Sequence, residues 1–140
     1  MSSDFTLVPD PDMDVIGELL AVCPSFRPVL KDHLASSSGE PRLPFVEAGA
    51  FGRHIVQLVS RGDTREFLAV FNAIERLYGK AGPAAETLLT YGLLETVQNV
   101  AMNEGVALEG FEQFLGPRTR LEWDYVIRIW NPEAPPRTRQ

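Results

Sequence analysis

The chain has 140 residues, 44% hydrophobic and 23% charged, which suits one folded domain with its own core and excludes disorder of the whole chain. Its formal net charge of −6 argues against nonspecific nucleic-acid binding, because such binding needs clustered basic side chains. A single cysteine excludes an intramolecular disulfide framework. The acidity suits a basic partner.

The sequence carries no recognisable cofactor motif. One cysteine and two histidines leave little for a zinc site, and neither a phosphate-binding loop nor an EF-hand loop is present. Residues 1–14 lack the basic and apolar regions of a secretory signal, and no apolar run reaches the length of a membrane span. We therefore expect a soluble cytoplasmic protein that takes no cofactor and binds neither nucleic acid nor membrane.

Proline and glycine divide the chain into about six or seven segments with helical periodicity. We expect an N-terminal arm over residues 1–11, a helical domain over 12–131 and a disordered tail over 132–140. The first helix follows Asp12, and a second is capped by Ser25 and precedes a loop over residues 36–44.

The middle of the chain predicts two amphipathic helices, one over residues 45–61 and one from Asp63 to Gly79. Asp63 and Glu66 have the spacing of a capping box, and the short link around Gly62 predicts that the two helices are antiparallel neighbours. The sequence GAFG at 49–52 places small residues inside the first of these helices, where they would let another helix approach closely.

A helix that begins at Pro83 and ends at Gly105 is apolar over most of its surface, which predicts a central position in the domain. A short helix over residues 108–115 follows. The last stretch, residues 115–130, alternates apolar and polar residues as a strand would, yet it also carries helix signals.

Two features decide this last stretch in favour of a helix. Thr119 and Glu122 have capping-box spacing, and Arg120, Asp124 and Arg128 stand four residues apart, as in a salt-bridge ladder. A helix here has two apolar flanks, one with Trp123, Val126, Ile127 and Trp130, the other with Leu121, Tyr125 and Ile129. One flank should pack on the domain, and the candidate interface aromatics are Trp123, Tyr125 and Trp130.

These elements predict an all-α single domain of antiparallel helices. A strand needs a pairing partner, and no convincing one exists. A compact bundle and an α-solenoid-like stack both stay open.

Five polar side chains form a candidate polar network or partner groove: Glu75, Tyr91, Glu95, Gln98 and Asn99. A buried carboxylate needs hydrogen-bond donors or a cation. Three roles stay open: an internal network that fixes helix register, a groove for a partner, and a general acid–base pair of Glu75 and Glu95. His33 and His54 are expected at the surface or at helix ends, and Cys23 as a buried structural thiol.

Three stretches resemble a family of small, functionally uncharacterised bacterial helical proteins: VFNAIERLYG (70–79), YGLLETVQNV (91–100) and FLGPRTRLEWDYVIRIW (114–130). The shared pattern is isoleucine–glutamate, then leucine–glutamate with glutamine–asparagine, then leucine–glycine–proline followed by spaced tryptophans. CPSF at 23–26 also fits. The family's usual serine after leucine–glycine–proline is Thr119 here, and its usual paired tryptophans are replaced by Leu121, Glu122 and Trp123. Some members resemble immunity proteins, so the resemblance implies a toxin-neutralising binder and supplies no catalytic residue.

Three functions follow as hypotheses. The first is a non-enzymatic cytoplasmic protein that binds another protein, such as an immunity-like inhibitor of a basic toxin. The second is a homo-oligomeric structural or regulatory module, for example a homodimer, that uses the C-terminal helix as its interface. The third is an enzyme that uses Glu75 and Glu95.

Overall fold

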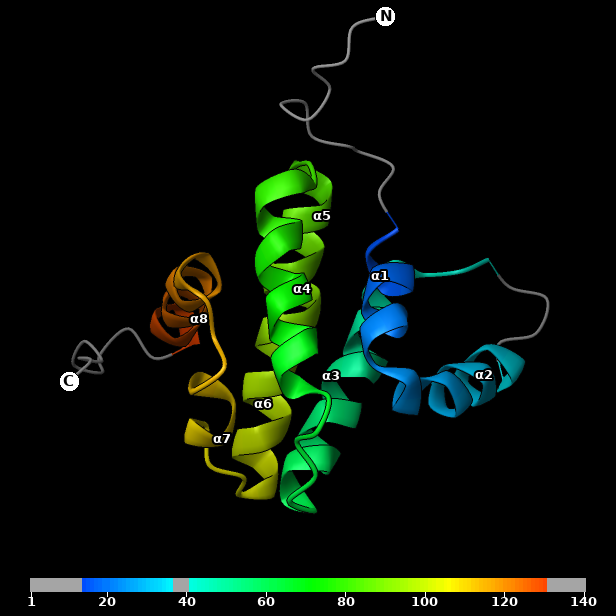
Figure 1. The fold of residues 1–140 in the computed structure, drawn as a ribbon, viewed down its shortest axis with the longest axis horizontal. Helices are drawn as coiled ribbons and strands as arrows, with labels where there is room; N and C mark the ends of the chain where they lie inside the picture. Colours follow the sequence, from blue (N-terminus) through cyan, green and yellow to red (C-terminus); the bar gives the residue numbers. More distant parts are fainter. Residues whose placement is uncertain (1–13, 37–40, 131–140) are drawn as a thin grey trace, which may run out of the picture.

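A computed structural model describes residues 14–36 and 41–130, and every regular element within these ranges is a helix (Figure 1). The all-α prediction is confirmed. The predicted arm at 1–11 and tail at 132–140 lie outside the described residues, as do residues 37–40 of the predicted loop at 36–44.

The helices follow one another with short connections. Their bounds are α1 (Val15–Val22), the 3-10 turn η2 (Pro24–Phe26), α2 (Arg27–Ser36), α3 (Pro44–Ser60), α4 (Phe67–Lys80), α5 (Pro83–Thr87), the π-helical η3 (Leu88–Leu94), α6 (Glu95–Glu104), α7 (Glu109–Glu112) and α8 (Pro117–Trp130). The segments α5, η3 and α6 run on without a break, which confirms the single helix predicted after Pro83, with wider turns in its middle.

The ends of the helices follow local chemistry. The side chain of Asp14 accepts a hydrogen bond from the Gly17 N–H, so α1 is capped by Asp14 and not by Asp12. Gly62 and Gly105, both with a φ of 73°, follow α3 and α6 in the left-handed conformation that glycine adopts at little cost.

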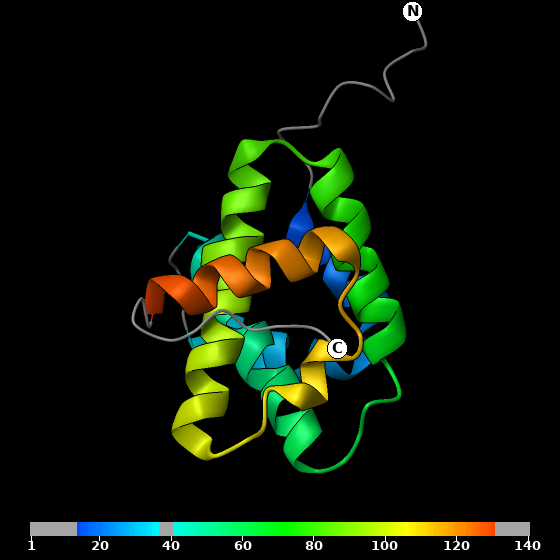
Figure 2. The same cartoon turned by 90° about the vertical axis from the view of Figure 1, so that its left-hand side faces the viewer.

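The predicted antiparallel pairing of the helices before and after Gly62 is wrong. The helix α3 packs chiefly against η3, α6 and α2, whereas α4 packs against α1, α5 and α8. The connection between α3 and α4 covers residues 61–66, longer than the one or two residues expected, so α4 can turn away from α3. The antiparallel neighbour of α4 is instead the long α5–η3–α6 segment, which follows a short turn (Figure 2).

Small residues let α3 approach that long segment closely, as predicted for the GAFG stretch. A Cβ atom placed on Gly52 would lie 3.0 Å from Cγ2 of Thr96, and one placed on Gly92 would lie 3.1 Å from Cδ1 of Phe45. Contacts this short mean that a side chain on either glycine would force its neighbours to shift by a few tenths of an ångström.

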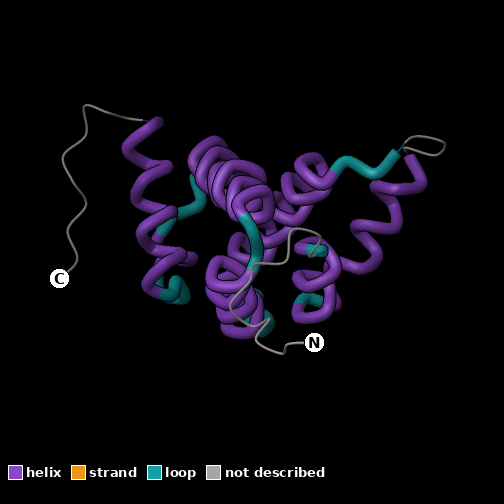
Figure 3. The backbone as a smooth tube through the Cα atoms, turned by 90° about the horizontal axis from the view of Figure 1, so that it is seen from above, coloured by secondary structure: helices purple, strands orange, loops and turns teal. Residues whose placement is uncertain are grey.

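The outermost layers lie at opposite ends of the molecule, with α8 on one side and α2 on the other (Figures 1 and 3). The helix α8 crosses both α4 and the long segment (Figure 2) and contacts α4, η3 and α6. A solenoid-like stack is not confirmed, because in a solenoid each helix pair contacts only its sequence neighbours. Here α8 covers helices from two different parts of the chain.

The core is rich in aromatic rings that are fully buried: Phe26, Phe51, Phe67, Phe71, Phe111 and Trp123. Phe67 contacts Phe71, Phe111 and Phe114, with ring centroids 5.4–6.1 Å apart. Rings at these separations stabilise a core beyond the area that they bury. They join α4 to the segment that leads into α8.

Two glycine-to-alanine substitutions test the packing of α3. We expect Gly52→Ala to lower the free energy of unfolding, because overpacking against Thr96 costs roughly 1–3 kcal/mol and exceeds the gain in helix propensity of about 1 kcal/mol.

The matched control is Gly79→Ala, since no atom lies within 4 Å of a Cβ at that helical position. We expect it to be stabilising by about 0.5 kcal/mol. Urea unfolding followed by circular dichroism measures both, and equal stabilisation by the two substitutions would contradict the close approach.

Candidate functional site

The first turn of α8 is held by a carboxylate from α4. The backbone N–H groups of Arg118 and Thr119 donate to Oε2 and Oε1 of Glu75, each at 2.9 Å. The Thr119 hydroxyl also donates to Oε1, at 2.7 Å. Glu75 therefore satisfies donors at the start of α8 that the helix itself leaves open.

The predicted capping box of Thr119 and Glu122 is wrong. The Thr119 hydroxyl donates to Glu75, and the Glu122 carboxylate accepts from Arg118 and Thr90. Gly116 makes room for this arrangement, because a Cβ atom there would lie 2.5 Å from Oε1 of Glu75. The leucine–glycine–proline stretch and the isoleucine–glutamate pair thus meet in space.

Glu75 is charged in this position. Partial burial alone would raise the pKa of its carboxyl group, but the hydrogen bonds from Thr119 and Arg118 together outweigh burial and lower the pKa. A carboxylate that already accepts three hydrogen bonds and holds its proton weakly is a poor general acid.

Arg118 is the centre of a second group of contacts beside the first turn of α8. Its guanidinium donates to Glu122 at 3.1 Å and to Glu86 at 3.2 Å. It also lies 5.0 Å from the ring centroid of Tyr78, within the range of a cation–π contact. Arg118, Glu86 and Glu122 border a cavity of about 220 Å³ between α5, η3 and α8.

Trp123 is a core residue and not an interface aromatic, so that prediction is wrong. Its side chain is 0% exposed. The indole N–H donates to Oε2 of Glu112 at 2.9 Å, and its backbone carbonyl accepts from Nε2 of Gln98 at 3.0 Å. The flank of α8 that carries Trp123 and Val126 is the one that packs on the domain.

The other flank of α8 is exposed. Leu121, Tyr125 and Ile129 are all exposed and stand four residues apart, so they form one apolar stripe. The hydroxyl group of Tyr91, on η3, donates to that of Tyr125 at 3.2 Å, and the two rings meet edge to face. We call these four residues the α8 face. Trp130, at the end of the helix, is also exposed.

The five predicted polar residues do not form one network. Glu75 and Gln98 each bind α8, and Tyr91 binds Tyr125, whereas no hydrogen bond or ion pair joins the side chains of Glu95 and Asn99 to other described residues. Three cavities among the described residues are lined by neither Glu75 nor Glu95.

The predicted salt-bridge ladder along α8 is also absent from the described chain. Arg120 donates to the backbone carbonyl of Glu112, at 3.1 Å, and Asp124 has a buried carboxylate oxygen without a hydrogen-bond partner. The side chain of Arg128 is exposed. Neither arginine reaches Asp124 because one is turned toward the α7 backbone and the other toward solvent.

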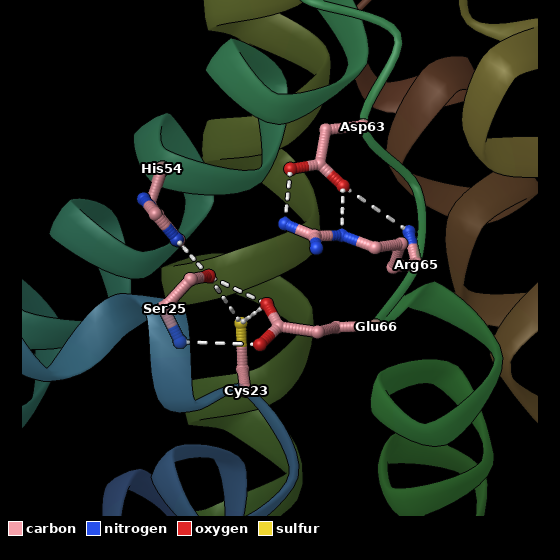
Figure 4. A network of polar contacts seen from close by, with 6 residues as sticks. All are labelled: Cys23, Ser25, His54, Asp63, Arg65 and Glu66. Atoms are coloured by element: carbon pink, nitrogen blue, oxygen red, sulfur yellow. Dashed lines mark hydrogen bonds and ion pairs between the residues drawn. The ribbon is translucent and has the colours of Figure 1, made fainter.

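A cluster that the sequence does not reveal lies where η2 meets α3 and α4 (Figure 4). The Ser25 hydroxyl lies 2.8 Å from Nε2 of His54 and donates to Oε1 of Glu66 at 2.5 Å. The Ser25 N–H and the Cys23 thiol also donate to Glu66. Glu66 therefore binds the chain before α2, and the predicted capping box of Asp63 and Glu66 is wrong.

The same cluster corrects the position predicted for His54. Its side chain is 6% exposed and packs on the ring of Phe26, with centroids 5.6 Å apart. Burial lowers the pKa of His54, although the charge of Glu66 opposes that effect. The buried thiol predicted at Cys23 is confirmed, and burial raises its pKa to about 12. A thiol of this kind is not a nucleophile near neutral pH.

One protein family matches the chain over residues 16–131, and it is described as a domain of unknown function (DUF7674). The chain belongs to this family. No curated protein and no solved structure matches it.

The match takes in the stretches that carry the family resemblance. Glu75, of the isoleucine–glutamate pair, binds the N–H groups that follow Pro117, and Gln98, of the glutamine–asparagine pair, binds the carbonyl of Trp123. Two of the motifs that are distant in sequence therefore act together on one helix.

Two other features, a membrane-spanning helix and a metal site, are absent from the described ranges. Within 14–36 and 41–130, no helix combines the length and apolar character needed to cross a membrane. These same residues bring together no group of three or more histidine, cysteine or acidic side chains that could hold a metal ion.

Two isosteric substitutions separate the roles of the predicted glutamate pair. We expect Glu75→Gln to lower the free energy of unfolding by roughly 1–3 kcal/mol, because an amide replaces a charged acceptor with one that cannot serve all three donors. Glu95→Gln is the control and should change stability by less than about 0.5 kcal/mol, because no hydrogen bond or ion pair joins the partly exposed Glu95 side chain to other described residues.

The loss of stability in the Glu75→Gln variant should also depend on pH. Because the pKa of Glu75 is lowered by folding, its stabilising effect is complete above the pKa of an unfolded glutamate and is lost as the pH falls through the folded-state pKa. The Glu75→Gln variant and the parent chain should therefore approach each other in stability on acidification. Denaturant unfolding at a series of pH values measures this, and a pH-independent difference would contradict it.

Proposed function

We propose that this chain is a non-enzymatic protein-binding protein, and that it binds its partner through the α8 face. The observation that carries the proposal is the apolar stripe of Leu121, Tyr125 and Ile129, which lies in solvent on a helix that packs on the domain through Trp123 and Val126 on its other flank. Contiguous exposed apolar surface on a folded domain is typical of an interaction site. Tyrosine is also a common anchor at protein interfaces.

The α8 face is held rigidly, which favours binding. Glu75 fixes the start of α8, and Glu112 and Gln98 fix its middle through Trp123. A surface that is ordered before binding loses little conformational freedom when the partner arrives, so more of the contact energy becomes affinity. The Tyr91–Tyr125 contact orders two of the side chains that a partner would touch.

The charges beside the α8 face favour a basic partner. Glu86 and Glu122 line the adjoining cavity with one cation, Arg118, between them. The formal net charge of the chain is −6. Complementary charge around an apolar centre speeds association and selects among partners. A basic toxin bound in the cytoplasm by an immunity-like protein is the specific form that the family resemblance suggests.

The use of Glu75 supports a non-enzymatic role. Its carboxylate accepts three hydrogen bonds from α8, and it does not line a described cavity together with Glu95. An acid–base pair would have to face a shared space in which substrate could lie.

Matched leucine substitutions test the binding face. Leu121 and Leu68 are exposed to 66% and 63%, so Leu121→Glu and Leu68→Glu introduce the same charge at equally exposed positions on different helices. Each protein encoded beside this one is coexpressed with the tagged parent chain and with each variant. We expect one of them to copurify with the parent chain and with Leu68→Glu, and to bind Leu121→Glu at least tenfold more weakly in calorimetry.

Two results would count against this proposal. The first is a partner that binds the two leucine variants equally well, since the α8 face would then not be the contact. The second is the recovery of the parent chain alone with every neighbouring protein. Thermal unfolding of both variants checks that neither loses binding through loss of fold.

A second copy of the chain is another candidate for the partner, and the charges along α8 favour it. In an antiparallel pair of α8 helices centred on Tyr125, Leu121 of one copy lies level with Ile129 of the other. Asp124 of one copy then lies within one turn of Arg128 of the second. Both side chains lack an ion pair within the described chain, so the stripe and its charges are self-complementary.

A charge swap distinguishes the two partners. We expect Arg128→Glu to raise the dissociation constant of a homodimer at least tenfold, and Asp124→Lys combined with Arg128→Glu to restore it. Arg76→Glu makes the same charge change at an exposed arginine on α4 and should have no effect. Sedimentation equilibrium measures all four chains, and a parent chain that stays monomeric at millimolar concentration rules out the homodimer.

A further inference from the structure

The hydrogen bonds of Ser25 determine which nitrogen of His54 carries its proton. A serine hydroxyl has one proton to donate, and that proton points at Oε1 of Glu66, 2.5 Å away. Partial burial would raise the pKa of Glu66, but the hydrogen bonds from Ser25 and Cys23 outweigh burial and lower it, so the carboxylate can only accept. The Ser25 oxygen must then accept from His54, and Nε2 of His54 carries the proton.

This arrangement leaves Nδ1 of His54 as a bare acceptor. A neutral imidazole protonated at Nε2 has its lone pair on Nδ1. Figure 4 shows Nδ1 on the side of the ring away from Ser25, and no described side chain donates to it. A buried ring thus has one nitrogen fixed by protein and the other free for an external donor.

The free nitrogen belongs to a residue that lines a cavity of about 370 Å³ between α2 and α3. That volume suits a small ligand. The lining combines one cation, one anion, two other polar side chains besides His54, and a small apolar area: Arg53, Asp32, His33, Gln57, Val29 and Ala50. Both histidines of the chain, His33 and His54, line this cavity.

We propose that this cavity binds a small zwitterion of the amino-acid type. Its ammonium group donates to Nδ1 of His54 and is balanced by Asp32, its carboxylate pairs with Arg53, and a short apolar side chain rests on Val29 and Ala50. A ligand with only one charge would leave either Asp32 or Arg53 without a complement. The site is separate from the α8 face and does not depend on the function proposed for that face.

The neutral state of His54 is a condition for this binding. Burial keeps its pKa below the ordinary value, opposed by Glu66 and reinforced by Arg61, while Asp32, His33 and Arg53 border the same cavity. As the pH falls through the folded-state pKa, Nδ1 takes up a proton and can no longer accept. The ligand should therefore bind at neutral pH and dissociate on acidification, with the loss centred on the titration of His54.

The protonation state is tested first, in the full-length ¹⁵N-labelled chain. Long-range ¹H–¹⁵N correlation spectra of the imidazole rings should show His54 as the Nε2–H tautomer at pH 7. Ser25→Ala removes the acceptor of that N–H and should give a mixture of tautomers while the backbone spectrum stays folded. Detection of the Nδ1–H tautomer in the parent chain would overturn the acceptor role of His54.

Binding is tested by titration with L-valine, followed through backbone amide shifts. Two controls each keep one charge of valine: 3-methylbutanoate has the carboxylate alone, and 2-methylpropylamine has the ammonium alone. We expect saturable shifts around His54 and Arg53 with valine, at a dissociation constant at least tenfold below that of either control. Arg53→Met should abolish the difference, whereas Arg76→Met, at an exposed arginine on α4, should leave it unchanged.

Two outcomes would overturn the zwitterion site: equal weak shifts with all three compounds, or no saturable shift with valine. His54→Phe keeps the ring contact with Phe26 and removes the acceptor. Binding of valine that survives this substitution in a folded chain would also overturn the proposed site.

Discussion

The carboxylate of Glu75 at the start of α8 is the contact on which the proposed binding surface depends. One side chain of α4 accepts from two consecutive backbone N–H groups and from the hydroxyl of Thr119. A negative charge at a helix N-terminus is also favoured by the helix dipole. Because the bonds reach the backbone, they fix the position and the rotation of α8 about its axis, and hence which of its two apolar flanks faces the domain.

The same chemistry recurs at two other places in the fold. Glu66 accepts from the backbone and side chain of Ser25, and Glu112 accepts from the indole N–H of Trp123. In each case a glutamate of one element satisfies donors that lie outside its own helix. Apolar packing alone tolerates several arrangements of helices, whereas directed bonds of this kind select one. The three glutamates therefore bring η2 and α8 to defined places on the central helices.

Helical periodicity was enough to predict the elements from the sequence, because the apolar spacing of α4 and of the long α5–η3–α6 segment fits a helix and does not fit a strand. The partners of polar side chains could not be predicted in this way. Thr119 has the spacing to form a capping box with Glu122, but spacing does not show that Glu75 would be nearer once α4 and α8 are packed. The box expected at Glu66 fails for the same reason, since Ser25 lies far away in sequence.

For the candidate site, too, the helix could be predicted from the sequence but its contacts could not. A helical wheel separates the flank of Trp123 from that of Tyr125, but it does not say which flank the domain covers. That choice depends on Glu112 and Gln98, whose side chains bind Trp123 from other helices. His54 escaped prediction because its polar position on α3 is covered by η2, a contact between segments that no local pattern reveals.

The exposed stripe on α8 is not required by the fold. Trp123 and Val126 supply the buried contacts of the helix, and Glu75 supplies its cap, so polar side chains at Leu121, Tyr125 and Ile129 would leave all of those interactions in place. Water disfavours apolar side chains, and solubility favours their replacement. A stripe that the described chain neither covers nor uses in these contacts supports the proposal that another molecule binds there.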